Sequence, residues 1–345
     1  MLENFVPVQP SLINAYKDFP VFIIHPDTGS LVRFLPRSGA YSDTAIRRLL
    51  ENGIKVFVTL LNEHEHREKF EQSLLLSLAG PFDEQKAAIV RDFTLMLVHE
   101  SLTRQELADE SQDGFSDNLL KLQELAEYYV ALLDLDSGED ILRLMHRVMS
   151  KDLTTATHSV NVMILTLRYL EKERKEGRSE WLQCVTPSED RSTTSAAERY
   201  ALKQWALSAL LHDIGKVMVP DQILKARRRL SSLEYSTMKM HVEHGWRIIN
   251  RAVPQFSSQR VIVRGILDHH ERMDGTGYPL QLTDVSLPGQ VIGILDCYEA
   301  LTTDKRPYRS AASPSDALRI LKEDTLSAKF QPDVYMKLVR LVADA

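Results

Sequence analysis

The segment ALKQWALSALLHDIGK (residues 201–216) is an apolar run that ends in a histidine and an aspartate. The apolar residues that precede His212 and Asp213 predict that both side chains are at least partly buried. A buried His–Asp pair is costly unless its polar atoms find partners, and a metal ion would supply such a partner. Imidazole and carboxylate together suit divalent Fe, Mn, Ni or Zn. An HD dipeptide alone is nevertheless a weak indication of a metal site.

Further metal-capable side chains lie on both sides of this pair in the sequence. One histidine opens an apolar helical run, TTATHSVNVMILTL (154–167), and another lies in STMKMHVEHGW (236–246). Two adjacent histidines begin HHERMDGTGYP (269–279), and an aspartate ends VIGILD (291–296). Any one of them alone is as easily a structural residue as a ligand. These residues are His158, His241, His269, His270 and Asp296.

The loop after the paired histidines is rich in residues that restrict or widen backbone freedom. Gly275 and Gly277 allow backbone angles that are closed to other residues. Tyr278 and Pro279 are expected to stiffen the segment that follows.

The N-terminal part predicts a small mixed α/β domain. PVFIIH (20–25), LVRFLP (31–36) and IKVFVTL (54–60) have the composition of strands. SDTAIRRLLENG (42–53) predicts a helix, which Ser42 or Asp43 could cap at its start and Gly53 could end.

The rest of the chain predicts helices. The segments 83–102 and 116–135 have apolar residues at three- and four-residue spacing, so they could pack on their own chain or pair across a dimer. Residues 141–345 are mostly helical in pattern, and the polar stretch 172–198 is interpreted as a surface loop or insertion.

Composition excludes several classes of protein. The 345 residues carry a net charge of −6, which does not favour general attraction to nucleic acid. No apolar run is long enough to span a membrane, and the start has no signal-peptide pattern. Two cysteines are too few for a disulfide framework, which fits a cytoplasmic protein.

Four motifs in this order resemble the HD-GYP family, a branch of the HD metal-dependent phosphohydrolases. Several multi-residue motifs in one order are far more specific than any of them alone. The motifs are HDIGKVMVPDQIL (212–224), MKMHVEHG (238–245), HHERMDGTGYP (269–279) and ILDCYEALTTDKRPYR (294–309).

The resemblance covers roughly residues 145–345 and implies an all-α HD-type domain there. Together with the small α/β domain that the N-terminal pattern predicts, the chain is expected to be α+β. We therefore expect a regulatory α/β domain at 1–80, a helical connector at 81–140 and the HD-GYP domain at 141–345.

The resemblance also implies a ligand set for divalent metal ions, iron or manganese first and nickel or zinc as alternatives. Asp213 would bridge two ions and take a catalytic part, and His244 matches no ligand position. A third ion is not expected, because family members that bind one have a glutamate where this chain has Thr154. The implied ligands are His158, His212, Asp213, His241, His269, His270 and Asp296.

The implied activity is hydrolysis of cyclic di-GMP to pGpG, GMP or both, through a hydroxide that bridges the metals. Lys216 would hold a phosphate oxygen and stabilise the transition state, and Arg306 and Arg309 resemble the family's phosphate-binding positions. The segment TTDKRPYR is one residue longer than the commonest form, so Lys305 also competes for this role.

The resemblance implies partners too. The loop that contains Gly277, Tyr278 and Pro279 would lie beside the active site, where Tyr278 either anchors the loop or contacts GGDEF-domain proteins. Two alternative functions stay open: a cyclic di-GMP receptor with little turnover, and a hydrolase of another cyclic dinucleotide.

Overall fold

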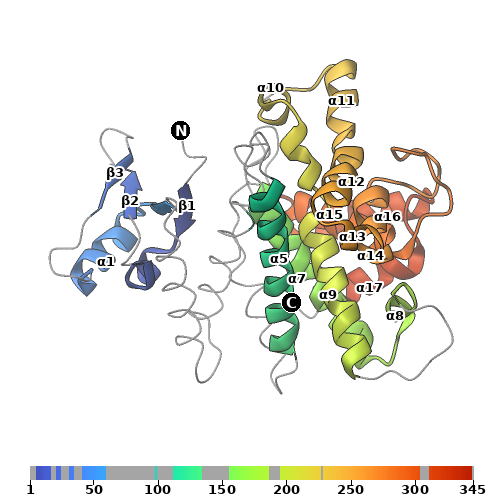
Figure 1. Cartoon of the computed structure of the whole chain (residues 1–345), viewed down its shortest axis with the longest axis horizontal. Coiled ribbons are helices and arrows are strands. Elements are labelled where there is room, and N and C mark those ends of the chain that lie inside the picture. The colour runs from blue at the N-terminus through green and yellow to red at the C-terminus, as the bar shows by residue number, and fades with distance from the viewer. Residues whose placement is uncertain are drawn as a thin grey trace. The chain divides into compact units, whose positions relative to one another are not determined.

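The structure, a computed structural model, describes residues 5–16, 21–24, 31–34, 41–59, 98, 112–133, 155–185, 195–226, 228–303 and 311–343. These residues belong to two compact units, Met1–Met96 and Leu97–Ala345 (Figure 1). The division into domains that we predicted, with boundaries after 80 and after 140, stays a prediction.

The N-terminal unit contains a four-stranded antiparallel sheet in the order β1-β4-β2-β3. The predicted strands and the predicted helix are confirmed, whereas β1 and the 3-10 helix η1 were not predicted. The elements are β1 (Phe5–Val8), η1 (Pro10–Tyr16), β2 (Val21–Ile24), β3 (Leu31–Arg33), α1 (Asp43–Glu51) and β4 (Val56–Thr59).

Helix α1 begins and ends where the sequence indicates. The Ser42 hydroxyl accepts a hydrogen bond from the backbone N–H of Ala45, and Gly53 has φ +59°, a left-handed conformation that suits glycine. Leu49 of this helix is buried, as are Val56 and Val58 of the central strand β4.

The described residues of the C-terminal unit are helical and contain no strand, so the predicted α+β class is confirmed. Within the described part of the chain, no helix is both long enough and apolar enough to cross a membrane. The elements are α5 (Gln112–Leu133), α7 (Thr155–Lys175), α8 (Glu180–Gln183), α9 (Ser195–Leu211), η2 (Ile214–Met218), α10 (Asp221–Leu224), α11 (Ser232–Lys239), α12 (His241–Ala252), α13 (Pro254–Ser257), α14 (Arg260–Asp268), α15 (Leu287–Thr302), α16 (Pro314–Leu326) and α17 (Pro332–Ala343).

The interpretation of 172–198 as a surface loop is wrong for most of its described residues. Helix α7 continues to Lys175, α8 follows, and Trp181 is buried. The charged side chains that suggested a loop form ion pairs instead: the buried ammonium of Lys337 on α17 lies 2.8 Å from Glu173 and 2.9 Å from Glu180. Composition alone could not reveal these partners, because Lys337 is distant in the sequence.

Helices α7, α9, α14 and α15 pack against one another and form the centre of the C-terminal unit. The 3-10 helix η2 packs against α12, and Gly215 makes that contact possible. A Cβ atom at Gly215 would overlap the backbone of His241 and Gly245. The absence of a side chain at this position brings the segment after His212 and Asp213 directly against the start of α12.

Candidate metal centre

The seven predicted ligands come from five parts of the C-terminal unit and meet at one place. His212 and Asp213 follow α9, His241 begins α12, and His269 and His270 follow α14. His158 lies on α7, and Asp296 lies on α15. They form three overlapping groups, and within each group the candidate donor atoms lie within 4.8 Å of one another. The groups are Asp213–His241–His269–His270, His158–His212–Asp213 and His212–His269–Asp296.

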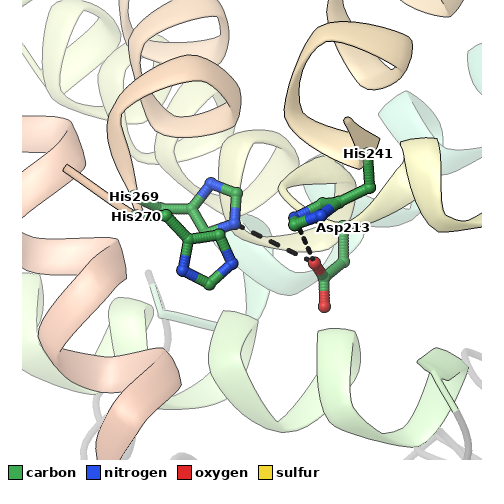
Figure 2. Close-up of side chains that lie close together, drawn as sticks. All are labelled: Asp213, His241, His269 and His270. Carbon is green, nitrogen blue, oxygen red and sulfur yellow. Dashed lines mark ion pairs between the residues drawn. The ribbon is translucent and has the colours of Figure 1, made fainter. Parts of the chain in front are cut away.

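The carboxylate of Asp213 faces two sets of imidazoles. Its Oδ1 atom lies 3.3 Å from Nε2 of His241 and 3.9 Å from Nε2 of His269. Its Oδ2 atom lies 3.3 Å from Nε2 of His212 and 3.6 Å from Nε2 of His158. Figure 2 shows the first of these sets, with His241, His269 and His270 gathered around the carboxylate. An aspartate with one oxygen toward each set has the arrangement of a bridging ligand.

Three of the imidazoles are oriented by the backbone in the same way. Nδ1 of His212 lies 2.8 Å from the carbonyl oxygen of Ala209, and Nδ1 of His241 lies 2.7 Å from that of Met238. Nδ1 of His269 lies 2.9 Å from the carbonyl oxygen of Ile266. Because a carbonyl only accepts, each Nδ1 carries the proton. Each Nε2 therefore presents its lone pair in the neutral tautomer that a metal binds.

The atoms that face the centre are the ones without partners. Among the described residues, Nε2 of His212, His241 and His269 and Oδ1 of Asp213 are buried and form no hydrogen bond. A buried polar atom without a partner costs about 1–3 kcal/mol. A divalent cation placed among these four atoms would give each of them a partner. The side chains present therefore fit a metal centre.

The ionisation states also suit a cation. Burial lowers the pKa of His269 to about 3 and that of His270 well below its usual value, so both imidazoles are neutral at pH 7. Burial alone would raise the pKa of Asp213, but Lys216 and the histidines hold it well below its usual range. Neutral His269 and His270 beside an ionised Asp213 have the protonation states that metal binding requires.

His158 is oriented differently, by a carboxylate that the sequence analysis missed. Oε2 of Glu299 lies 2.5 Å from Nδ1 of His158, and Oε1 accepts hydrogen bonds from Asn161 at 2.8 Å and Thr303 at 2.7 Å. Burial opposes protonation, yet Asp296 and Glu299 raise the pKa of His158 to about 10. The spacing of Glu299 three residues after Asp296, on one face of α15, could have indicated its place.

Lys216 is held at the centre by an ion pair. Its ammonium contacts Oδ2 of Asp213, and its side chain is 25% exposed. The partly exposed lysine therefore reaches the carboxylate of Asp213, as the helical spacing of the two residues predicts.

Glu271, which follows the paired histidines, holds the GYP loop and does not join any of the three groups. Its carboxylate accepts hydrogen bonds from the backbone N–H of Leu280 at 2.6 Å and of Leu282 at 2.9 Å. Tyr278 stacks on His270, with 4.6 Å between the ring centroids and 25° between the ring planes. The loop is thus fixed to the segment that bears the histidines.

The two loop glycines have different roles, which corrects the prediction that both supply unusual backbone angles. Gly275 has φ +75°. Gly277 is not among the residues with positive φ; a Cβ atom there would overlap the backbone of Glu271 and Arg272. Gly277 is therefore required by the close approach of two backbone segments.

Some predicted residues stand apart. Arg306 and Arg309, together with Lys305, lie outside the described residues, and so does Thr154. His244 belongs to none of the three groups, as expected.

Similarity to known proteins agrees with this geometry. The sequence profile of the HD domain matches residues 172–334. The chain is 36% identical over 143 residues to "Cyclic di-GMP phosphodiesterase PA4108" of Pseudomonas aeruginosa, which covers 41% of this chain and 33% of the relative. It is 30% identical over 191 residues to a "Cyclic di-GMP phosphodiesterase" of Thermotoga maritima, which covers 53% of this chain and 48% of the relative. The chain thus spans between a third and a half of these relatives.

A solved structure has the same fold. "Bd1817, a HDG"Y"P protein from Bdellovibrio bacteriovorus" superimposes with a TM-score of 0.66 at 16% identity, over 98% of this chain and 99% of that one. The HD-domain match at residues 172–334, the related sequences and the shared fold agree, and this chain is similar to HD-GYP proteins.

Proposed function

We propose that this chain is a metal-dependent phosphodiesterase that hydrolyses cyclic di-GMP to pGpG, to GMP, or to both in succession. The observation that carries the proposal is the carboxylate of Asp213, whose two oxygens face separate sets of imidazoles. A carboxylate in this position suits a pair of bridged divalent ions.

The metal ligands that we propose are the seven residues of the three groups, with iron or manganese as the ions. Two divalent ions held by these residues would supply an activated water and stabilise charge on the phosphate. His212, His241 and His269 hold their lone pairs toward the centre, and burial among protein atoms excludes bulk water from that side. These ligands are: His158, His212, Asp213, His241, His269, His270 and Asp296.

We propose that the ammonium group of Lys216 binds the phosphate that reacts. In the structure its ammonium contacts Asp213, and the part-exposed side chain is placed to hold a phosphate oxygen as negative charge develops. Arg306 and Arg309 are proposed as further phosphate contacts on chemical grounds, because guanidinium groups bind phosphate through paired hydrogen bonds.

Tyr278 is proposed as an anchor of the GYP loop. Its ring stacks on His270 and its backbone N–H donates to the carbonyl oxygen of His270 at 3.2 Å. The alternative, a contact with GGDEF-domain proteins through Gly277, Tyr278 and Pro279, stays open, because Tyr278 and Pro279 are partly exposed.

The names of the relatives support cyclic di-GMP and also raise a second candidate substrate. The chain is 32% identical over 136 residues to "3'3'-cGAMP-specific phosphodiesterase 1" of Vibrio cholerae, which covers 39% of this chain and 30% of the relative. This substrate differs from cyclic di-GMP in one base, so the same metal centre would serve both.

One assay tests the proposal and the rival functions together. The full chain, reconstituted anaerobically with Fe(II) or Mn(II), is incubated with cyclic di-GMP or with 3'3'-cGAMP, and the products are resolved by chromatography. We expect linear dinucleotide or mononucleotide from cyclic di-GMP at the higher rate. Binding of cyclic di-GMP without turnover would favour the receptor function, and faster cleavage of 3'3'-cGAMP would favour the second candidate.

A further inference from the structure

A row of aromatic rings and one ammonium group leads outward from the metal-facing histidines. His270 stacks on Tyr278 with 4.6 Å between ring centroids. Nζ of Lys239 lies 5.8 Å from the Tyr278 ring centroid and 5.3 Å from the centroid of the Tyr235 ring. Tyr235, at the outer end, is 50% exposed. The row therefore connects the centre with the protein surface.

The position of this row is fixed relative to the metal centre. Tyr235 and Lys239 lie one turn apart on α11, and His241 begins α12 only two residues after Lys239. The N-terminus of α11 is secured by a capping box, in which Ser231 and Glu234 exchange hydrogen bonds. The outer residues are thus carried on a defined helix that leads directly into a proposed ligand.

Lys239 differs from Lys216 and Lys225 in its partners. Lys216 contacts Asp213, and Lys225 lies 3.1 Å from Asp221. Within the described part of the chain, Lys239 forms no ion pair with a carboxylate and lies over two aromatic rings instead. An ammonium held over ring faces keeps its charge and its outward N–H donors for an anion.

We propose that Tyr235 and Lys239 form a substrate subsite, in which Lys239 binds the phosphate that is not being cleaved and Tyr235 stacks on one purine base. This rests on the proposed function, which supplies an anionic ligand with two phosphates and two purines. The metal centre and Lys216 engage only the phosphate that reacts, so the second half of the ligand needs contacts outside the centre. Stacking of a base on an aromatic side chain strengthens binding by roughly 10-fold or more.

The experiment compares a large substrate with a small one. The full chain loaded with Mn(II) and the variants Lys239→Ala and Tyr235→Ala are assayed with cyclic di-GMP and with bis(p-nitrophenyl) phosphate. The small substrate has one phosphodiester and no purine, so it reports on the metal centre alone. For cyclic di-GMP we expect kcat/KM to fall roughly 10-fold or more in each variant, mainly through KM. Hydrolysis of bis(p-nitrophenyl) phosphate should change less than about twofold, since no contact with the reacting phosphate is lost.

The chain offers a second pair with a similar ring–ammonium contact as a control, although Lys203 also forms an ion pair with Glu127 at 2.5 Å. Tyr200 is 46% exposed and carries the ammonium of Lys203 5.8 Å from its ring centroid, on α9. Twelve residues separate Tyr200 from His212, which is about 18 Å along a helix. Tyr200→Ala and Lys203→Ala should leave both reactions unchanged.

Three outcomes would overturn the inference. Equal losses with both substrates, together with lower metal content, would show that Lys239 only supports Tyr278 and His270. Unchanged kinetics with cyclic di-GMP would show that neither residue contacts the ligand. If the wild-type chain cleaves bis(p-nitrophenyl) phosphate but neither cyclic dinucleotide, the proposed function is wrong, and the subsite is wrong with it. This failure is recognised in the wild type, before any variant is compared.

Discussion

The carboxylate of Glu299 on α15 lies 2.5 Å from Nδ1 of His158 on α7. Among the clustered histidines of the described residues, His158 is therefore oriented by a carboxylate. His212, His241 and His269 instead direct Nδ1 to backbone carbonyl oxygens. A negative partner makes an imidazole a stronger electron donor than a neutral carbonyl does. The half of the centre that contains His158 therefore differs electronically from the half that contains His241.

Glu299→Gln should weaken metal binding, because the amide keeps a hydrogen bond to His158 but removes the charge. We expect a loss of affinity of roughly 10-fold, the lower end of what such partners contribute. Competition with a chelator measures it without any assay of activity. Thr303→Val is the control, since it removes a donor to Oε1 and leaves the contact with His158 intact. Equal affinity of Glu299→Gln and the wild type would contradict this role.

Asp213→Ala should abolish turnover and lower the metal content, since both sets of imidazoles lose the carboxylate between them. Helical content, measured by circular dichroism, should stay largely intact because α9 and α12 are secured by their own packing. Full activity in this variant would rule out the proposed mechanism.

Lys216→Ala should leave the metal content unchanged while activity falls by roughly 100-fold, the size expected for loss of a transition-state contact. Arg309→Ala should behave in the same way if it also holds phosphate. Metal analysis of both purified variants separates the two effects. Loss of metal in both would mean that they support the ligands and not the substrate.

Gly277→Ala should displace the GYP loop, because the added methyl group overlaps the backbone of Glu271 and Arg272. Overpacking of this kind costs about 1–3 kcal/mol, and thermal unfolding of the metal-free chain would report it as a lower Tm. Thr276→Ala is an exposed neighbour that should have a much smaller effect. An unchanged Tm in Gly277→Ala would show that the loop can move aside freely.

The purified chain should bind two metal ions and not three, because Thr154 offers no carboxylate at the position expected for a third site. Metal analysis by mass spectrometry gives the stoichiometry, and anomalous scattering locates each ion in crystals. Three fully occupied ions in the substrate-free chain would refute this prediction.

The sequence predicted the residues of the candidate centre better than it predicted the residues that hold them in place. The HD pair and the paired histidines are short motifs, and the structure brings all seven predicted residues together. The roles of Glu271 and Glu299 depend on which distant groups their carboxylates meet, and no periodicity in a single sequence contains that information. Glu271 illustrates the difficulty: its position beside two histidines favours a ligand, whereas its oxygens accept from the backbone of the GYP loop.

The error at 172–198 has a similar origin. Charged residues favour a solvated loop in a single sequence, and only the fold places Lys337 against Glu173. Strands β2, β3 and β4 and helix α1 were predicted correctly because turn and capping residues mark their ends locally, whereas β1 was not predicted.

The bonds from Nδ1 of His212, His241 and His269 to the carbonyl oxygens three residues earlier restrict which substitutions this centre could accept during evolution. Each histidine satisfies an acceptor in its own turn and also offers a donor atom to an ion. A cysteine or aspartate at the same position could still bind a metal, but it has no ring N–H for the buried carbonyl. Exchange of ligand type, a common route to a new metal preference, would therefore cost folding free energy at these positions even where the new metal binds well. Changes in metal preference would arise more readily at Asp296, whose carboxylate donates no hydrogen bond to a carbonyl, or at His270, whose ring contacts among the described residues are with aromatic rings.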